Sequence, residues 1–165
     1  MPRRVIAALA RIWALFGGGV LLAVMVMTVA SVVLRATTGR PILGDFELVE
    51  MGTAIAAFAF LPYCQQTRGN VLVDFFTQGA PERLKSGLAA LASLLLLLLA
   101  LLLLWRMSLG GLDFHRFREE TTNLGIPRWW AFPPILISLA LLALTALATL
   151  VEDIAALRRG RQPAP

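Results

Sequence analysis

Residues that carry out chemistry are scarce in this chain of 165 amino acids, which contains one cysteine and one histidine. Cys64 alone cannot form a disulfide within the chain or a metal site built from several thiols. His115 lies close to Asp113 but has no second histidine at metal-binding spacing, and no apolar run holds a histidine that would ligate a haem. A nucleophile elbow and a glycine-rich loop after a strand are both missing. We therefore expect no enzyme, no catalytic residue, no metal site and no cofactor in this chain.

Charged residues are missing from four long apolar runs, which cover residues 12–34, 51–67, 86–105 and 129–151. The chain is 58% hydrophobic, with a mean hydropathy of +0.77, whereas a soluble domain of this size is roughly half apolar. A helix rises about 1.5 Å per residue, so roughly 20 apolar residues cross the ~30 Å hydrocarbon core of a bilayer. Because the backbone must satisfy its own hydrogen bonds in lipid, the runs predict helices.

The four runs predict an all-α integral membrane protein with one four-helix membrane domain over residues 1–165. The second run is too short to cross the membrane alone, so its helix should include about one more turn of neighbouring residues. We therefore expect spans at about residues 12–34, 46–67, 82–105 and 128–151. The first run exceeds the roughly 7–15 apolar residues of a secretory signal, which predicts a retained helix. Ionisable groups inside a span commonly mark the path of an ion or a substrate. Their absence here argues against transport by this chain alone.

The distribution of basic residues predicts the orientation of the chain. Four spans place both termini on the same side as the connection between spans two and three. That side carries nine basic residues and the other side six, so the positive-inside rule predicts cytoplasmic termini. The basic residues form no patch of their own, and the net charge of +5 therefore does not indicate a nucleic-acid partner. Tryptophans at the predicted span ends indicate anchoring at the membrane boundary; they are Trp13, Trp105, Trp129 and Trp130.

The ends of the spans carry capping and turn signals. Asp45 suits the N-cap of the second span, which we expect to begin near Phe46. Gly125 suits a left-handed turn and Pro127 the start of the fourth span. The third helix has few breakers after Trp105, so we expect it to continue beyond the membrane.

Two further patterns fall outside the span ends. Amphipathic patterns at residues 1–11 and 70–79 predict short helices in the membrane interface. Gly17-Gly18-Gly19 lies inside the first span, where it favours a close contact with another helix, with a kink as the alternative.

Four sequence blocks carry a resemblance to a known family. They are GDFELVEMG at the start of span two, RGNVLVDFF after it, APERLK before span three, and TTNLGIPRWWAFPP before span four. Together, in this order and with four spans, they resemble the DctQ-like small membrane subunits of tripartite ATP-independent periplasmic (TRAP) transporters. The resemblance covers residues 12–155. Asn70 departs from it, since a histidine is expected after the glycine.

The resemblance implies a non-catalytic small permease subunit in a bacterial inner membrane, surrounded by membrane lipid. Its partners would be a large permease subunit, which carries the sodium and substrate sites and moves as an elevator, and a periplasmic substrate-binding protein. The small subunit would act as a fixed scaffold for the uptake of an organic acid. The alternative is a self-contained transporter or channel formed by several copies of this chain, which would need a polar seam.

The resemblance and the sidedness of the charges also suggest contact residues. For the interface with the large subunit we select Glu47, Glu50, Gly52, Ala56, Arg68, Gly69, Asp74, Pro127 and Trp129. For a docking face toward the binding protein we select Arg35, Arg40, Arg116, Arg118 and Arg128. Simpler roles compete with these selections: a solvated helix cap for Glu47 and Glu50, and an internal ion pair between Arg68 and Asp74.

Overall fold

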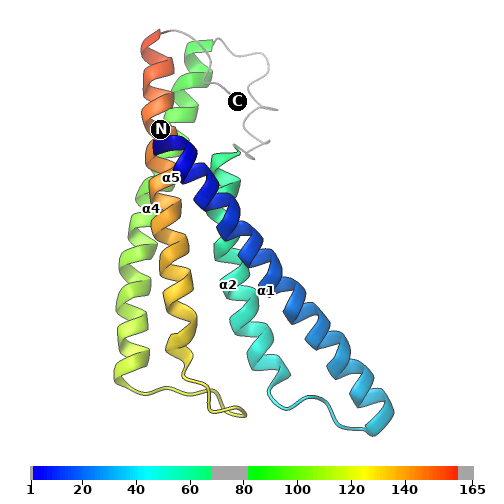
Figure 1. The fold of residues 1–165 in the computed structure, drawn as a ribbon. Coiled ribbons are helices and arrows are strands. Elements are labelled where there is room, and N and C mark those ends of the chain that lie inside the picture. Colours follow the sequence, from blue (N-terminus) through cyan, green and yellow to red (C-terminus); the bar gives the residue numbers. More distant parts are fainter. Residues whose placement is uncertain (1, 68–81, 160–165) are drawn as a thin grey trace.

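The computed structural model describes residues 2–67 and 82–159. It contains α1 (Pro2–Thr38), α2 (Asp45–Gln66), α4 (Glu82–Arg116), the short 3-10 helix η1 (Arg128–Ala131) and α5 (Phe132–Arg159) (Figure 1). The four long helices are each long and apolar enough to cross a membrane. Within the described ranges there is no β-strand, and a single bridge joins Glu120 to Pro127. The prediction of an all-helical protein with four helices long and apolar enough to span a membrane is confirmed for the described residues.

Helix α1 differs from its predicted form, because residues 2–11 make its first turns rather than a separate interfacial helix. No proline interrupts the chain between residues 3 and 38, so the helix has no strong breaker. Its 37 residues measure about 55 Å, which exceeds the ~30 Å core of a bilayer. Figure 1 shows α1 inclined against the other helices, and such a tilt is how a long helix fits a thin membrane. The second predicted interfacial helix, at residues 70–79, lies outside the described residues.

The other helices begin close to the predicted starts of their spans. Helix α2 begins at Asp45, and the residue before it is Gly44 with a φ of 72°. Asp45 is therefore the first helical residue and not the expected N-cap. Helix α4 continues to Arg116, which confirms its extension past Trp105.

The long helices form an open layer in the order α1–α2–α5–α4. Helix α5 packs along both α4 and α2, and α2 packs along α1, while α1 reaches α5 over a shorter stretch. The edge helices α1 and α4 share no extensive contact. The first residues of α1 and the end of α5 point toward the same end of the layer (Figure 1), as four spans require. We call this the inner end, and the end with η1 the outer end.

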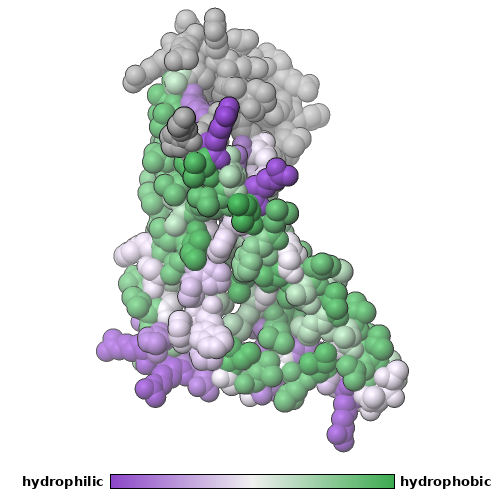
Figure 2. All heavy atoms as spheres, viewed as in Figure 1, coloured by the Kyte–Doolittle hydropathy of each residue, from purple (hydrophilic) through white to green (hydrophobic). Residues whose placement is uncertain are grey.

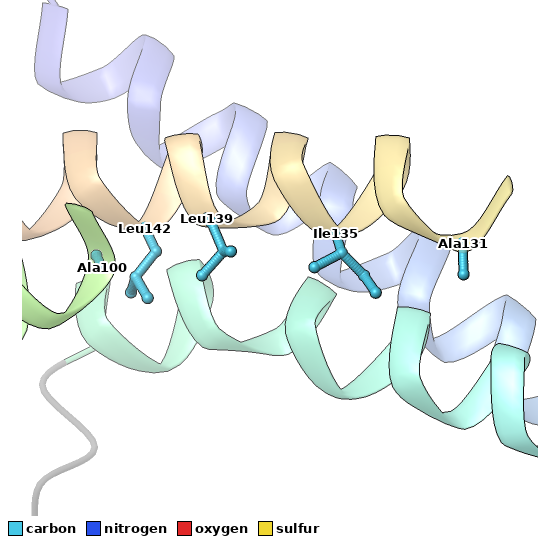
Figure 3. Packing of buried hydrophobic residues seen from close by; sticks show 5 residues of the cluster. All are labelled: Ala100, Ala131, Ile135, Leu139 and Leu142. Carbon is cyan, nitrogen blue, oxygen red and sulfur yellow. The ribbon is translucent and has the colours of Figure 1, made fainter. Parts of the chain in front are cut away.

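The core of the layer lies along α5, where α2 and α4 pack against it. Ile135, Leu139 and Leu142 of α5 are buried, with Ala131 before them and Ala100 of α4 beside them, and Figure 3 shows the α5 side chains pointing toward α2. The face shown in Figure 2 is mostly hydrophobic along the helices, with the most hydrophilic side chains near their ends. This distribution suits a protein whose outer surface meets lipid.

Small residues bring α1 and α2 close together. A Cβ atom added to Gly17 would lie 2.7 Å from Cβ of Ala59 and 3.3 Å from the carbonyl oxygen of Ala56. Further toward the outer end, Gly52 packs directly against Val24. The helix-contact interpretation is confirmed at Gly17, whereas Gly18 and Gly19 have open space where a side chain would be.

Candidate functional site

A buried carboxylate fastens the outer connection of the chain to α2. Glu47 is 8% exposed, and its Oε1 accepts hydrogen bonds from the backbone N–H of Asn123 at 2.7 Å and from Nδ2 of Asn123 at 3.1 Å. Its Oε2 accepts a hydrogen bond from the backbone N–H of Leu124 at 3.1 Å. Hydrogen bonds to a charged acceptor are among the stronger ones in proteins. Glu47 therefore holds residues 123 and 124 as a built-in clamp.

The connection that Glu47 holds is shaped by Thr121. The N–H of Thr121 donates to the carbonyl oxygen of Ile126 at 2.9 Å, and its Oγ1 accepts from the N–H of Ile126 at 3.0 Å. Gly125 supplies the turn with a φ of 63°, which confirms its predicted left-handed conformation. Leu124 then packs directly on Gly44. The backbone of Gly44 is left-handed, and Leu124 occupies the space where a side chain would be. Both features favour glycine at this position.

A second polar group joins α1 to the start of α2. Ser31 donates its hydroxyl to Oδ2 of Asp45 at 2.5 Å, and the same hydroxyl accepts the N–H of Ile42 at 3.2 Å. Oδ1 of Asp45 accepts the N–H of Phe46 at 2.8 Å. Ser31 of α1 thus binds both the connection, at Ile42, and the first residue of α2, which fixes the two helices relative to each other.

Three hydrogen bonds between side chains cross the layer deeper inside. Ser93 of α4 donates to Oδ2 of Asp153 in α5 at 2.6 Å, and Nε2 of Gln65 in α2 donates to Oγ1 of Thr149 at 2.9 Å. The indole N–H of Trp13 donates to Oγ of Ser138 at 2.8 Å. Each bond joins α5 to a different helix. Such bonds between membrane helices contribute about 0.6 kcal/mol each on average.

The bond to Ser138 corrects the role expected for Trp13. The sequence placed this tryptophan at the membrane boundary as an anchor. Ser138 is 1% exposed and lies within α5, so the indole of Trp13 packs inside the layer. It also contacts Phe16, with ring centroids 5.1 Å apart.

The residues selected for the large-subunit interface fall into different places. Gly52 and Ala56 are buried in the contact with α1, and Glu47 bonds within the chain. Glu50 is exposed on α2. Arg68, Gly69, Asn70 and Asp74 lie outside the described residues.

Pro127 and Trp129 stand at the outer end of α5. Pro127 is the N-cap of η1. Trp129 is half-buried and meets the ring of His115 edge-on, at 5.0 Å between centroids. His115 therefore contributes to an aromatic contact between α4 and η1.

The five arginines selected for docking do not form one patch. Arg35 and Arg40 lie at the outer end of α1, whereas Arg116 and Arg118 lie at that of α4, on the opposite edge of the layer (Figure 1). These four are exposed and Arg128 is half-buried. Arg118, two residues after the end of α4, has a φ of 50°, a left-handed conformation that glycine usually supplies after a helix.

Among the described residues, no three His, Cys, Asp or Glu side chains are grouped so that they could hold a metal ion. The arrangement offers polar clamps between helices and broad exposed faces.

The chain was compared with known families. The family described as "Tripartite ATP-independent periplasmic transporters, DctQ component" matches residues 24–156. No curated protein and no solved structure matches the chain. The matched range contains Glu47, the connection that it holds, and all of α2.

Proposed function

Because the chain belongs to the DctQ family of tripartite ATP-independent periplasmic transporters, we propose that it is a fixed scaffold for the large permease subunit of such a transporter. The assembly would take up an organic acid by sodium-coupled transport across a bacterial inner membrane, with a substrate-binding protein delivering the acid. The sodium and substrate sites, and the elevator motion, belong in this proposal to the large subunit.

The observation that carries this proposal is the open layer of helices. The layer is fastened at the outer end by Glu47 and Asp45, and toward the inner end by Gln65 and Asp153. A layer fixed at both ends is suited to remain still while a neighbouring subunit moves. Its two edges and broad apolar faces leave room for a large partner in the same membrane.

A pull-down from the native membrane tests the scaffold. We expect the chain, carrying a fluorescent protein at its C-terminus, to recover a large polytopic permease in stoichiometric amount in mild detergent. Mass spectrometry identifies the proteins recovered with the chain. A fluorescent protein that matures only in the cytoplasm reports the predicted orientation in the same cells. Recovery of copies of this chain alone would instead support the homo-oligomeric transporter or channel.

Docking of the binding protein is proposed for the exposed arginines of the outer end. Asp113, Glu119 and Glu120 are exposed around Arg116 and Arg118, so the surface carries both signs and suits a partner with a matching mixed pattern. We expect R116E/R118E to raise, by roughly tenfold, the concentration of binding protein that gives half-maximal uptake. Uptake is measured in proteoliposomes at low and high salt. The charge reversal Arg106→Glu, also in α4, serves as the control. If uptake depends on the concentration of binding protein in the same way for both variants, this docking site is wrong.

A further inference from the structure

One face of α2 is left uncovered by the rest of the chain. Its residues are spaced by three or four positions, so they form a single stripe along the helix. All of them are exposed; they are Phe46, Glu50, Thr53, Ala57, Leu61 and Cys64, and we call them the open face of α2. Helix α1 covers the side with Gly52 and Ala56, and α5 covers the side with Ile55 and Phe58.

The composition of the open face differs from that of the faces which suit lipid. The exposed side of α4 is built from large apolar residues such as Leu91, Leu95 and Leu98. The centre of the open face has Thr53 and Ala57 instead, and α2 is the least apolar of the four spans. Small residues and hydroxyls let two helix backbones approach closely, which is typical of helix contacts in membranes.

The charge of Glu50 restricts what can cover this face. Glu50 lies five residues into α2, about 7.5 Å from its start. Its neighbour Met51 packs against the buried apolar cluster of the layer, so Glu50 lies on a stretch of α2 that runs beside the hydrophobic core. A carboxylate that faces hydrocarbon is costly unless a partner group meets it. Lipid tails supply no such group.

A second copy of this chain is also a poor occupant. Copies in one membrane have the same orientation, so a twofold dimer through this face would bring the face against itself. Glu50 would then approach Glu50, and opposed like charges disfavour an interface. The occupant therefore belongs to a different chain and brings a positive charge or hydrogen-bond donors to this level.

We propose that one transmembrane helix of the large permease subunit packs on the open face of α2, with a basic side chain opposite Glu50. This inference rests on the proposed scaffold function and adds the surface through which the scaffold holds its partner. Thr53 and Ala57 give that helix its closest approach, and Leu61 and Cys64 continue the contact toward the inner end.

The first test places a bulky side chain in the centre of the face. We expect Ala57→Trp to reduce the large subunit recovered with the tagged chain by roughly tenfold. Leu98→Trp makes the matched control, because Leu98 is 55% exposed on α4 and its face suits lipid. Glu50→Lys places a cation opposite the proposed basic residue, and we expect it to reduce recovery while Glu50→Gln retains most of it.

The native cysteine gives a second test that needs no variant. Cys64 is the single cysteine of the chain and is exposed on the open face. A membrane-permeable maleimide should therefore label it roughly tenfold more slowly in the assembled transporter than in the chain expressed alone.

The outcomes separate the two proposals. If the unchanged chain recovers no large subunit, the scaffold function and this surface both fail. If the unchanged chain recovers it, while Ala57→Trp behaves like Leu98→Trp and Cys64 reacts equally fast in both preparations, the scaffold stands and the open face is wrong. Oxidative cross-linking of two copies through Cys64 would assign the face to a homodimer and would also overturn the proposal.

Discussion

Replacing Gly17 with leucine is expected to separate α1 from α2 and to lower the free energy of unfolding by about 1–3 kcal/mol. A Cβ at this position would lie 2.7 Å from Cβ of Ala59. A main-chain oxygen and a methyl group cannot rotate away, so the helices themselves must move apart. Unfolding of the purified chain in mixed micelles, with increasing dodecyl sulfate, measures the loss.

Gly19 provides the matched control in the same helix. It has open space where a side chain would be, so Gly19→Leu adds the same atoms without a clash. Because glycine is a poor helix former, this variant should be unchanged or more stable by up to about 1 kcal/mol. Equal unfolding curves for the two variants would show that the contact between α1 and α2 is not as close as the structure has it.

Replacing Glu47 with glutamine is expected to release the connection between α4 and η1. Three hydrogen bonds end on the two carboxylate oxygens, and an amide offers one oxygen and a donor that faces other donors. The backbone N–H groups of Asn123 and Leu124 then lose a charged acceptor. We expect their hydrogen exchange to become roughly tenfold faster or more.

Glu50→Gln is the control for Glu47, since it is the same change three residues away on an exposed position. It should leave exchange at Asn123 and Leu124 unchanged in the isolated chain. If Glu47→Gln also leaves it unchanged, Thr121 alone holds the connection, and the clamp described for Glu47 contributes nothing measurable.

The spans were predictable because lipid imposes simple rules. A charge-free run of sufficient length has few options other than a helix, so all four helices were predicted, although α1 begins earlier than its predicted span, at Pro2, and α4 ends later, at Arg116. Gly125 was predictable for a similar reason, since a left-handed turn strongly favours glycine. In both cases a local property of the sequence decides the structure.

The contacts of Glu47 were not predictable, because its partners are backbone N–H groups of residues 123 and 124. Every residue except proline has such a group, so the sequence does not mark these donors. The contact of Trp13 with α5 was not predictable for a related reason. An indole near the start of an apolar run suits both a membrane boundary and a helix contact.

The small residues of α2 show a further limit of the sequence. Gly52 and Ala56 were selected for a partner, and the structure uses them to pack α1. Thr53 and Ala57, one position further along, are the exposed ones. Both sets have the spacing of a packing surface, and the pattern alone does not say which set meets a helix of the same chain.

The order of helices in the layer has a consequence for how the chain enters the membrane. Helices α1 and α2 are consecutive and pack together, so this pair can close as soon as both are in lipid. Helix α4 enters third, but its main neighbour is α5, which enters last. Until then α4 must persist as a single helix surrounded by lipid. A run of leucines is well suited to that interval, since it is apolar on every side and needs no partner to be stable in hydrocarbon.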